Sequence, residues 1–196
     1  GDAVPSDFSS QFDGLLPNGP ITAPLTTPEN ITLGVAIRPL KYFTLTADYQ
    51  YVGWDSYDKL EVQFEDFIDS ETGEQLVSTS ERFYDNGFIA RIGAEYEYSK
   101  TFTARGGFLY DHNPVPDERL DPTLPDSDRL GFNLGGSYNL NESFSLEAAY
   151  MFLRFDERKI TNSLENYSGI DNSISPMNGV YNSIAHLFSV SLAYKF

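Results

Sequence analysis

The sequence predicts an all-β protein, an antiparallel transmembrane β-barrel of which seven strands can be recognised in this chain. Seven segments alternate large apolar side chains with small or polar ones, and this period of two indicates strands. Each segment approaches the roughly 9–11 residues that a tilted strand needs to cross a bilayer, whereas strands of soluble sheets average about 5–6. Tight turns and long polar connections alternate between the segments, as in outer-membrane barrels.

The last strand, residues 185–196, shows the pattern most clearly. Large apolar or aromatic residues occupy one parity: Phe188, Val190, Leu192, Tyr194 and Phe196. Small or polar residues occupy most of the other. A terminal strand that ends in phenylalanine resembles the assembly signal of bacterial outer-membrane barrels. This resemblance implies that Phe196 contacts the barrel assembly machinery.

The elements fall into two predicted regions. Residues 1–28 are rich in proline and are predicted to be irregular, at best with a short strand at 21–26. Residues 29–196 are predicted to hold the barrel strands, at 30–38, 43–54, 88–98, 102–110, 130–140, 144–153 and 185–196. Tight turns lie near Leu40, Lys100 and Glu142, and long connections span 55–85, 111–129 and 156–180. The short turns are then periplasmic, the long loops extracellular and the C-terminus periplasmic.

Composition excludes several other classes of protein. A balance of 13 Lys and Arg against 29 Asp and Glu gives a net charge of −16, which argues against nucleic-acid binding. The chain has no cysteine, so disulfides and thiolate metal sites are excluded, and no cofactor or metal site is predicted. With two histidines and no G-x-S-x-G or H-E-x-x-H motif, we do not expect an enzyme. The start shows no apolar leader, so any secretory signal is expected to have been removed or to lie outside this sequence.

Two alternative folds and one question about the loops stay open at this point. In a soluble antiparallel protein the apolar parity would face a core. A closed eight-stranded barrel would use residues 21–26 as its eighth strand. The acidic loops, which hold most of the Asp and Glu residues, are either simply solvated or bind divalent cations that bridge to lipopolysaccharide.

One connection carries a specific resemblance. The run from Tyr110 to Pro116, followed by Leu124 to Arg129, resembles the FadL-type outer-membrane transporters of long-chain fatty acids and other hydrophobic compounds. Those proteins have a D-x-x-P-V-P stretch followed by P-D-x-D-R between consecutive strands. The matching residues are Asp111, Pro114, Val115, Pro116, Pro125, Asp126, Asp128 and Arg129. Residues 27–30 and 47–54 are similar as well.

The resemblance implies an uptake channel in the bacterial outer membrane, with outer-membrane lipid and lipopolysaccharide as neighbours. It also implies a barrel of fourteen strands with an N-terminal hatch inside, whereas the family's Asn-Pro-Ala start is absent here. Single-chain barrels have even strand numbers. We therefore expect this chain to be the C-terminal half of a longer protein. A small structural or adhesive barrel without transport is the alternative function.

The polar parity lines the predicted bore and becomes apolar toward the long loops. The residues expected to bind a hydrophobic ligand are Trp54, Ile89, Arg91, Leu109, Met151, Leu153, Phe155 and Leu187. Arg91 is expected to pair with a ligand carboxylate. Alternatively, the apolar residues pack against a hatch or loop, and a bulge near Gly53 would turn Trp54 to lipid. Asp128 and Arg129 are expected to anchor the proline-rich loop through an ion pair.

Overall fold

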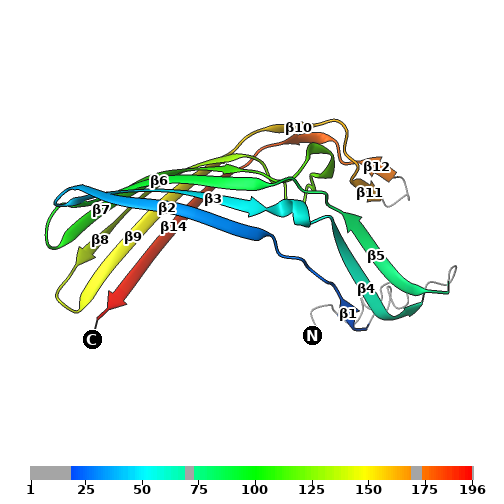
Figure 1. The fold of residues 1–196 in the computed structure, drawn as a ribbon, viewed down its shortest axis with the longest axis horizontal. Coiled ribbons are helices and arrows are strands. Elements are labelled where there is room, and N and C mark those ends of the chain that lie inside the picture. Colours follow the sequence, from blue (N-terminus) through cyan, green and yellow to red (C-terminus); the bar gives the residue numbers. More distant parts are fainter. Residues whose placement is uncertain (1–18, 69–72, 169–173, 196) are drawn as a thin grey trace, which may run out of the picture. The chain divides into compact units, whose positions relative to one another are not determined.

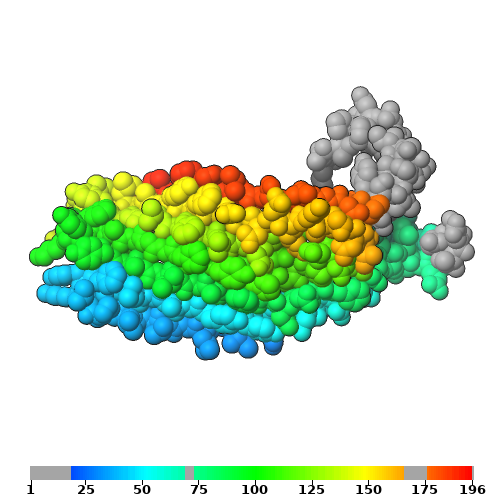
Figure 2. All heavy atoms as spheres, turned by 90° about the horizontal axis from the view of Figure 1, so that it is seen from above, coloured from blue at the N-terminus to red at the C-terminus, as the bar shows by residue number. Residues whose placement is uncertain are grey.

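A computed structural model describes residues 19–68, 73–168 and 174–195, and its main feature is a curved antiparallel sheet of seven strands (Figure 1). In spatial order the strands are β2 (Glu29–Leu40), β3 (Phe43–Gly53), β6 (Gly87–Glu97), β7 (Phe102–His112), β8 (Arg129–Asn139), β9 (Phe144–Phe155) and β14 (Ile184–Tyr194). Figure 2 shows them side by side, from β2 in blue to β14 in red. The seven predicted strands are confirmed.

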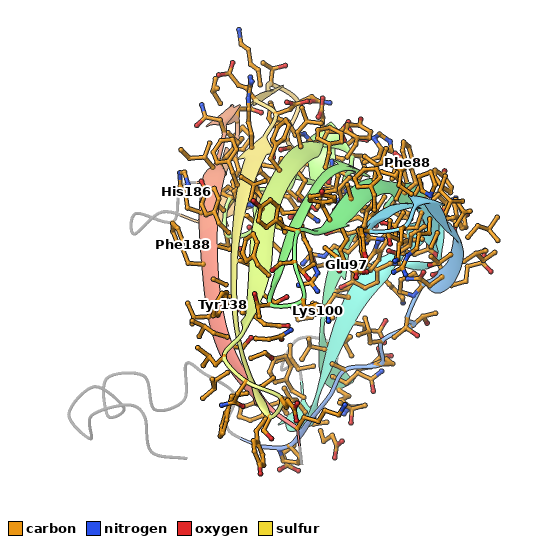
Figure 3. All side chains as sticks on the ribbon, turned by 90° about the vertical axis from the view of Figure 1, so that its left-hand side faces the viewer. Phe88, Glu97, Lys100, Tyr138, His186 and Phe188 are labelled. Atoms are coloured by element: carbon orange, nitrogen blue, oxygen red, sulfur yellow. The ribbon has the colours of Figure 1, made fainter. Side chains whose placement is uncertain are left out.

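Continuous register gives the sheet two chemically different faces. Leu45, Ala94, Gly106, Leu134, Tyr150 and Phe188 lie in one row across six strands. The next residue along each strand belongs to the other face, where charged and polar groups gather. Figure 3 shows Phe188 and His186 on the convex side and Glu97 on the concave side. We call these the outer and the inner face.

The apolar side chains of the outer face are not buried in a core. Leu134 is 68% exposed, Phe188 78% and Val190 75%. Such exposure over a whole sheet face costs far too much free energy in water, because apolar area is favoured out of water by about 25 cal/mol per Å². The soluble-core alternative is therefore wrong for this sheet. The fully buried apolar residues among those described, Leu120 and Ile160, lie in the connections instead.

Short turns join the strands at one end of the sheet, as predicted. In one turn, the Ser99 hydroxyl oxygen accepts hydrogen bonds from the backbone N–H groups of Thr101 and Phe102, at 3.2 and 3.0 Å. In another, the side-chain oxygen Asn141 Oδ1 accepts hydrogen bonds from the backbone N–H groups of Ser143 and Phe144, both at 2.9 Å. Side chains that replace backbone partners in this way favour turns over continued strands.

The long connections contain short elements of their own. One includes η1 (Trp54–Ser56), and the next includes η2 (Asp117–Arg119). The last holds two small two-stranded sheets. In one, β10 (Arg158–Ile160) pairs with β13 (Gly179–Tyr181), and in the other, β11 (Asn166–Ser168) pairs with β12 (Ile174–Pro176). No helix in the described part of the chain is long and apolar enough to cross a membrane.

A second compact unit comprises the described residues of Gly1–Thr26 and Tyr57–Arg82. Its sheet consists of β1 (Ile21–Thr22), β4 (Lys59–Ile68) and β5 (Gln75–Glu81). Ile21 pairs with Phe64 of β4, so the proposal that residues 21–26 supply an eighth barrel strand is wrong. Phe196, predicted to carry the assembly signal, lies outside the described residues.

Candidate inner-face ligand site

Ion pairs between residues of different strands line part of the inner face. Arg91 Nη1 lies 2.7 Å from Asp48 Oδ1, and Arg105 Nε lies 2.7 Å from Glu95 Oε2. Arg38 Nη2 is 3.1 Å from Glu97 Oε1. In each pair the two residues come from different strands among β2, β3, β6 and β7. This side of the inner face is therefore charged, with the positive and negative groups matched.

An apolar patch lies beside these pairs, on β7 to β14. Leu109, Gly131 and Leu153 are directly opposite one another on three adjacent strands. A Cβ on Gly131 would lie 2.7 Å from Leu109 Cγ and 2.9 Å from Leu153 Cδ2, so the two leucine side chains meet over the glycine. Met151 and Leu187 face each other in the adjacent inner row. We call Leu109, Leu153, Met151 and Leu187 the leucine patch.

Ile89 and Phe155 lie one inner row closer to the long connections, but a charged pair separates them. In this row the order is Ile89, Asp111, Arg129 and Phe155. Arg129 Nη2 lies 2.7 Å from Asp111 Oδ2, and its guanidinium sits 5.5 Å from the centre of the Phe155 ring. The apolar zone is thus confined more narrowly than the sequence pattern indicates.

Arg91 shares the row of Leu109 and Leu153 but turns away from them. Its two terminal nitrogens donate to Asp48 Oδ1 and Gln50 Oε1, both at 2.7 Å. A ligand carboxylate would therefore compete with Asp48 for this guanidinium. The boundary between polar and apolar side chains runs diagonally across the inner face. At the level of the leucine patch, β3 and β6 still carry charged side chains, whereas β7 to β9 carry apolar ones.

Trp54 lies beyond the end of β3, in η1. Its indole ring packs edge-on against Tyr84, with the ring centres 6.2 Å apart. Trp54 Cδ1 is 3.6 Å from the position that a Cβ on Gly87 would take. Because Gly87 has inner-face parity in β6, Trp54 lies on the inner side of the strand ends, away from the leucine patch.

The proline-rich connection is held at both ends by its acidic residues. Asp128 accepts hydrogen bonds from Tyr110 Oη at 2.5 Å and from the backbone N–H of Asn113 at 2.9 Å, and its carboxylate lies 3.0 Å from His112 Nδ1. Burial acts to raise the pKa of this carboxyl, but the hydrogen bonds from Tyr110, Asn113 and His112 outweigh burial and keep the pKa below its ordinary value.

Asp128 and Arg129 both anchor this connection, but they use different partners. Consecutive strand-end residues point to opposite faces, so Asp128 meets Tyr110 and His112 while Arg129 meets Asp111 and Asp126. Both residues therefore anchor the connection as expected, and Arg129 does so through ion pairs with Asp111 and Asp126.

Arg158, which the sequence did not single out, joins two of the long connections. Its guanidinium donates to Asp117 Oδ1 and to the backbone oxygens of Val115 and Asp126. Val115 and Asp126 belong to the P-V-P and P-D-x-D-R segments. No local spacing could have revealed Arg158, because its partners lie in another connection. Among the described residues, no three His, Cys, Asp or Glu side chains converge to hold a metal ion.

One apolar face, one polar face and membrane-length strands define a transmembrane β-barrel wall. The sequence model of the family described as "Outer membrane protein transport protein (OMPP1/FadL/TodX)" matches residues 8–196. The chain belongs to this family, and the resemblance noted from the P-V-P and P-D-x-D-R segments is confirmed.

Individual relatives agree with the family assignment. Over 148 residues the chain is 28% identical to the long-chain fatty acid transport protein of Escherichia coli O6:H1, covering 76% of this chain and 31% of that protein. It is 25% identical to outer membrane protein P1 of Haemophilus influenzae, covering 88% and 36%. The chain thus spans about a third of the length of these relatives.

Solved structures show the same fold. A Pseudomonas aeruginosa FadL homologue superimposes with a TM-score of 0.68 at 22% identity, covering 89% of this chain and 37% of that one. The CymD monoaromatic hydrocarbon channel superimposes with a TM-score of 0.61 at 17% identity, covering 90% and 38%.

Proposed function

We propose that this chain forms part of the wall of an outer-membrane channel that takes up hydrophobic small molecules, either long-chain fatty acids or other hydrophobic compounds. The observation that carries the proposal is the meeting of Leu109 and Leu153 over Gly131 on the inner face. A water-filled porin keeps its bore polar, so an apolar patch here favours a ligand that prefers to leave water. The relatives' names, which describe transport proteins and channels, favour transport over catalysis.

The leucine patch can contribute free energy to ligand binding, because its side chains are only partly buried. Leu187 is 49% exposed, and the other three members are half-buried. A hydrocarbon that covers the remaining apolar area gains about 25 cal/mol per Å², or roughly 0.8 kcal/mol per methylene group removed from water. Several methylene groups together give several kcal/mol, which is sufficient for reversible capture before release.

Arg91 is proposed to select ligands that carry a carboxylate. It lies at the level of the leucine patch, and Asp48 holds its guanidinium until an acidic ligand replaces that contact. Arginine binds carboxylates through two parallel hydrogen bonds. Arg91→Gln should therefore weaken binding of a fatty acid while leaving a neutral aromatic hydrocarbon unaffected.

The orientation and the other partners belong to the same proposal. The long connections face outside and the C-terminus faces the periplasm, because short turns are the periplasmic ones in such barrels. The terminal strand is proposed to contact the barrel assembly machinery through Phe196. The acidic connections are proposed to lie beside lipopolysaccharide.

Equilibrium binding with charge-introducing variants tests the proposal. Leu153→Asp places a carboxylate within the leucine patch, and Phe155→Asp places one in the row beyond it. Ser189→Asp is the matched control, because Ser189 is on the inner face in the row of Gly135 and Ala149, outside the patch. Fatty-acid affinity should fall at least tenfold in Leu153→Asp and change little in the control. The loss should be smaller in Phe155→Asp, because the neighbouring Arg129 guanidinium can neutralise the new carboxylate. Equal affinities in all folded variants would rule out the patch as the binding surface.

A further inference from the structure

Arg154 is the one lysine or arginine with outer-face parity among the described strand residues of the seven-stranded sheet. It lies near the end of β9 opposite Leu130 and Ile184, in the row that includes Leu33 and Tyr49. Its side chain is exposed, and it has no hydrogen-bond or ion-pair partner within the described residues. An arginine on an apolar face, with no internal partner, requires an external anion or water.

The height of Arg154 in the membrane follows from strand geometry. Phe144, at the other end of β9, packs against Tyr194 with the ring centres 4.8 Å apart, and it marks the aromatic level beside the short turns. Ten residues at about 3.4 Å each, tilted by 35–45°, rise about 24–28 Å. The apolar band of such barrels is about 25 Å tall. Arg154 therefore reaches the headgroup level of the opposite leaflet.

One further polar side chain, His186, lies near Arg154 on the same face. His186 is opposite Phe152, and this makes it a diagonal neighbour of Arg154, at about 7–8 Å between Cα atoms. Its Nδ1 is 2.8 Å from the Tyr150 hydroxyl, so this contact orients the imidazole ring. Figure 3 shows His186 on the convex side of β14. Arg154 and His186 can thus bind one anionic group between them.

An apolar groove runs below these residues on the same three strands. It has a volume of about 570 Å³, a floor that includes Gly136 and Ala148, and walls that include Tyr150 and Phe188. From Arg154 down to Ala148 the strand descends roughly 15 Å at the same tilt. This is about half of the ~30 Å hydrocarbon core, which is the depth of one leaflet.

From this combination we propose that the outer face of β8, β9 and β14 binds one phosphorylated glycolipid of the outer leaflet. The lipid's phosphate monoester lies at Arg154 and His186, and one acyl chain fills the groove. Arginine and phosphate make strong paired hydrogen bonds, and a monoester carries more negative charge than the diester of an ordinary phospholipid. The site depends on the proposed orientation, with the long connections outside, and is separate from the leucine patch.

Native mass spectrometry of the protein purified from outer membranes and stripped of lipid tests this assignment. The probes are lipid A, lipid A with its phosphates removed, and phosphatidylglycerol. We expect one lipid A to bind at least tenfold more tightly than either of the other two, since a charge-assisted hydrogen bond corresponds to about that factor. Equal binding of dephosphorylated lipid A, or of phosphatidylglycerol, would overturn the assignment without the need for any variant.

Variants then locate the site on the protein. Arg154→Gln should lower lipid A affinity at least tenfold, and Ala148→Leu, which fills the groove, should lower it as well. Lys100→Gln is the matched control, because it removes a positive charge at the short-turn rim. Fatty-acid affinity should be unchanged in all three variants, so a failure of the transport proposal would be seen separately. Unchanged lipid A binding by Arg154→Gln would refute the site.

Discussion

Replacement of Arg158 by alanine should loosen the two long connections while leaving the sheet intact. The Arg158 side chain is 12% exposed and makes four hydrogen bonds, two to Asp117 and two to the backbone oxygens of Val115 and Asp126, at 2.9 and 3.0 Å. Asp117 is 60% exposed, so water can solvate its carboxylate after the change.

The free energy of local opening that Arg158→Ala removes can be estimated from these contacts. A pair with an exposed carboxylate contributes at most about 1 kcal/mol. Each backbone oxygen that loses its donor contributes about 1 kcal/mol, and the packed arginine stem adds a similar amount. The total is about 2–4 kcal/mol for local opening, which corresponds to a factor of roughly 30 to several hundred in hydrogen exchange.

Amide hydrogen exchange provides the measurement. The reporter is the Leu164 N–H, which donates to Glu118 O at 2.8 Å and so links the two connections. Lys159→Ala is the matched control, because Lys159 is the exposed neighbour of Arg158 and makes no ion pair among the described residues. If Leu164 exchanges equally slowly in Arg158→Ala and in the control, Arg158 does not hold the connections together.

Three other perturbations give independent checks. The Asp128 carboxyl has a lowered pKa in the folded loop, so it stabilises that loop above the ordinary carboxyl pKa of about 4, and this stabilisation is lost as pH falls through the folded value. Protection of the Asn113 amide, measured relative to the intrinsic exchange rate at each pH, should therefore fall below about pH 4, and Asp128→Asn should remove this fall; a protection profile that Asp128→Asn leaves unchanged would contradict this. Leu134→Arg on the outer face should reduce stability in bilayers by about 2–4 kcal/mol in urea unfolding, whereas Ala149→Arg on the inner face should change it little; equal losses would contradict the assignment of faces. Leu120→Ala removes a fully buried side chain and should lower the stability of the 111–129 connection by about 2–3 kcal/mol. The connection should then be cleaved faster by protease, and cleavage as slow as in the wild type would contradict this prediction.

The sheet was predictable because each strand carries its own pattern. Alternation assigned Leu134 to one face and Arg105 to the other without any knowledge of neighbouring strands, and the serine and asparagine turns are local as well. Parity also placed Leu109 and Leu153 on one face. Their meeting over Gly131 depends on the register of three strands, which the pattern alone does not give.

The features that the sequence did not predict are contacts between distant segments. Asp48 pairs with Arg91 because β3 lies beside β6 across an intervening long connection, so this partner could not be identified from sequence spacing. Trp54 was expected to continue the alternation of β3, but the chain turns into η1 at that residue. Ile21–Thr22 forms a strand, as its residues permit, but pairs with β4 of the second unit.

The inner-face glycines determine how far neighbouring side chains project from the wall. A Cβ on Gly93 would lie 2.9 Å from Thr46 Oγ1, and a Cβ on Gly107 would lie 2.9 Å from Asn133 Oδ1. The side chains of Thr46 and Asn133 lie over the backbone of these glycines, as those of Leu109 and Leu153 lie over Gly131. A single added methyl group at any of these glycines would lift the neighbouring side chain into the open space. How far the inner surface of the wall projects is therefore set by the residues that have no side chain.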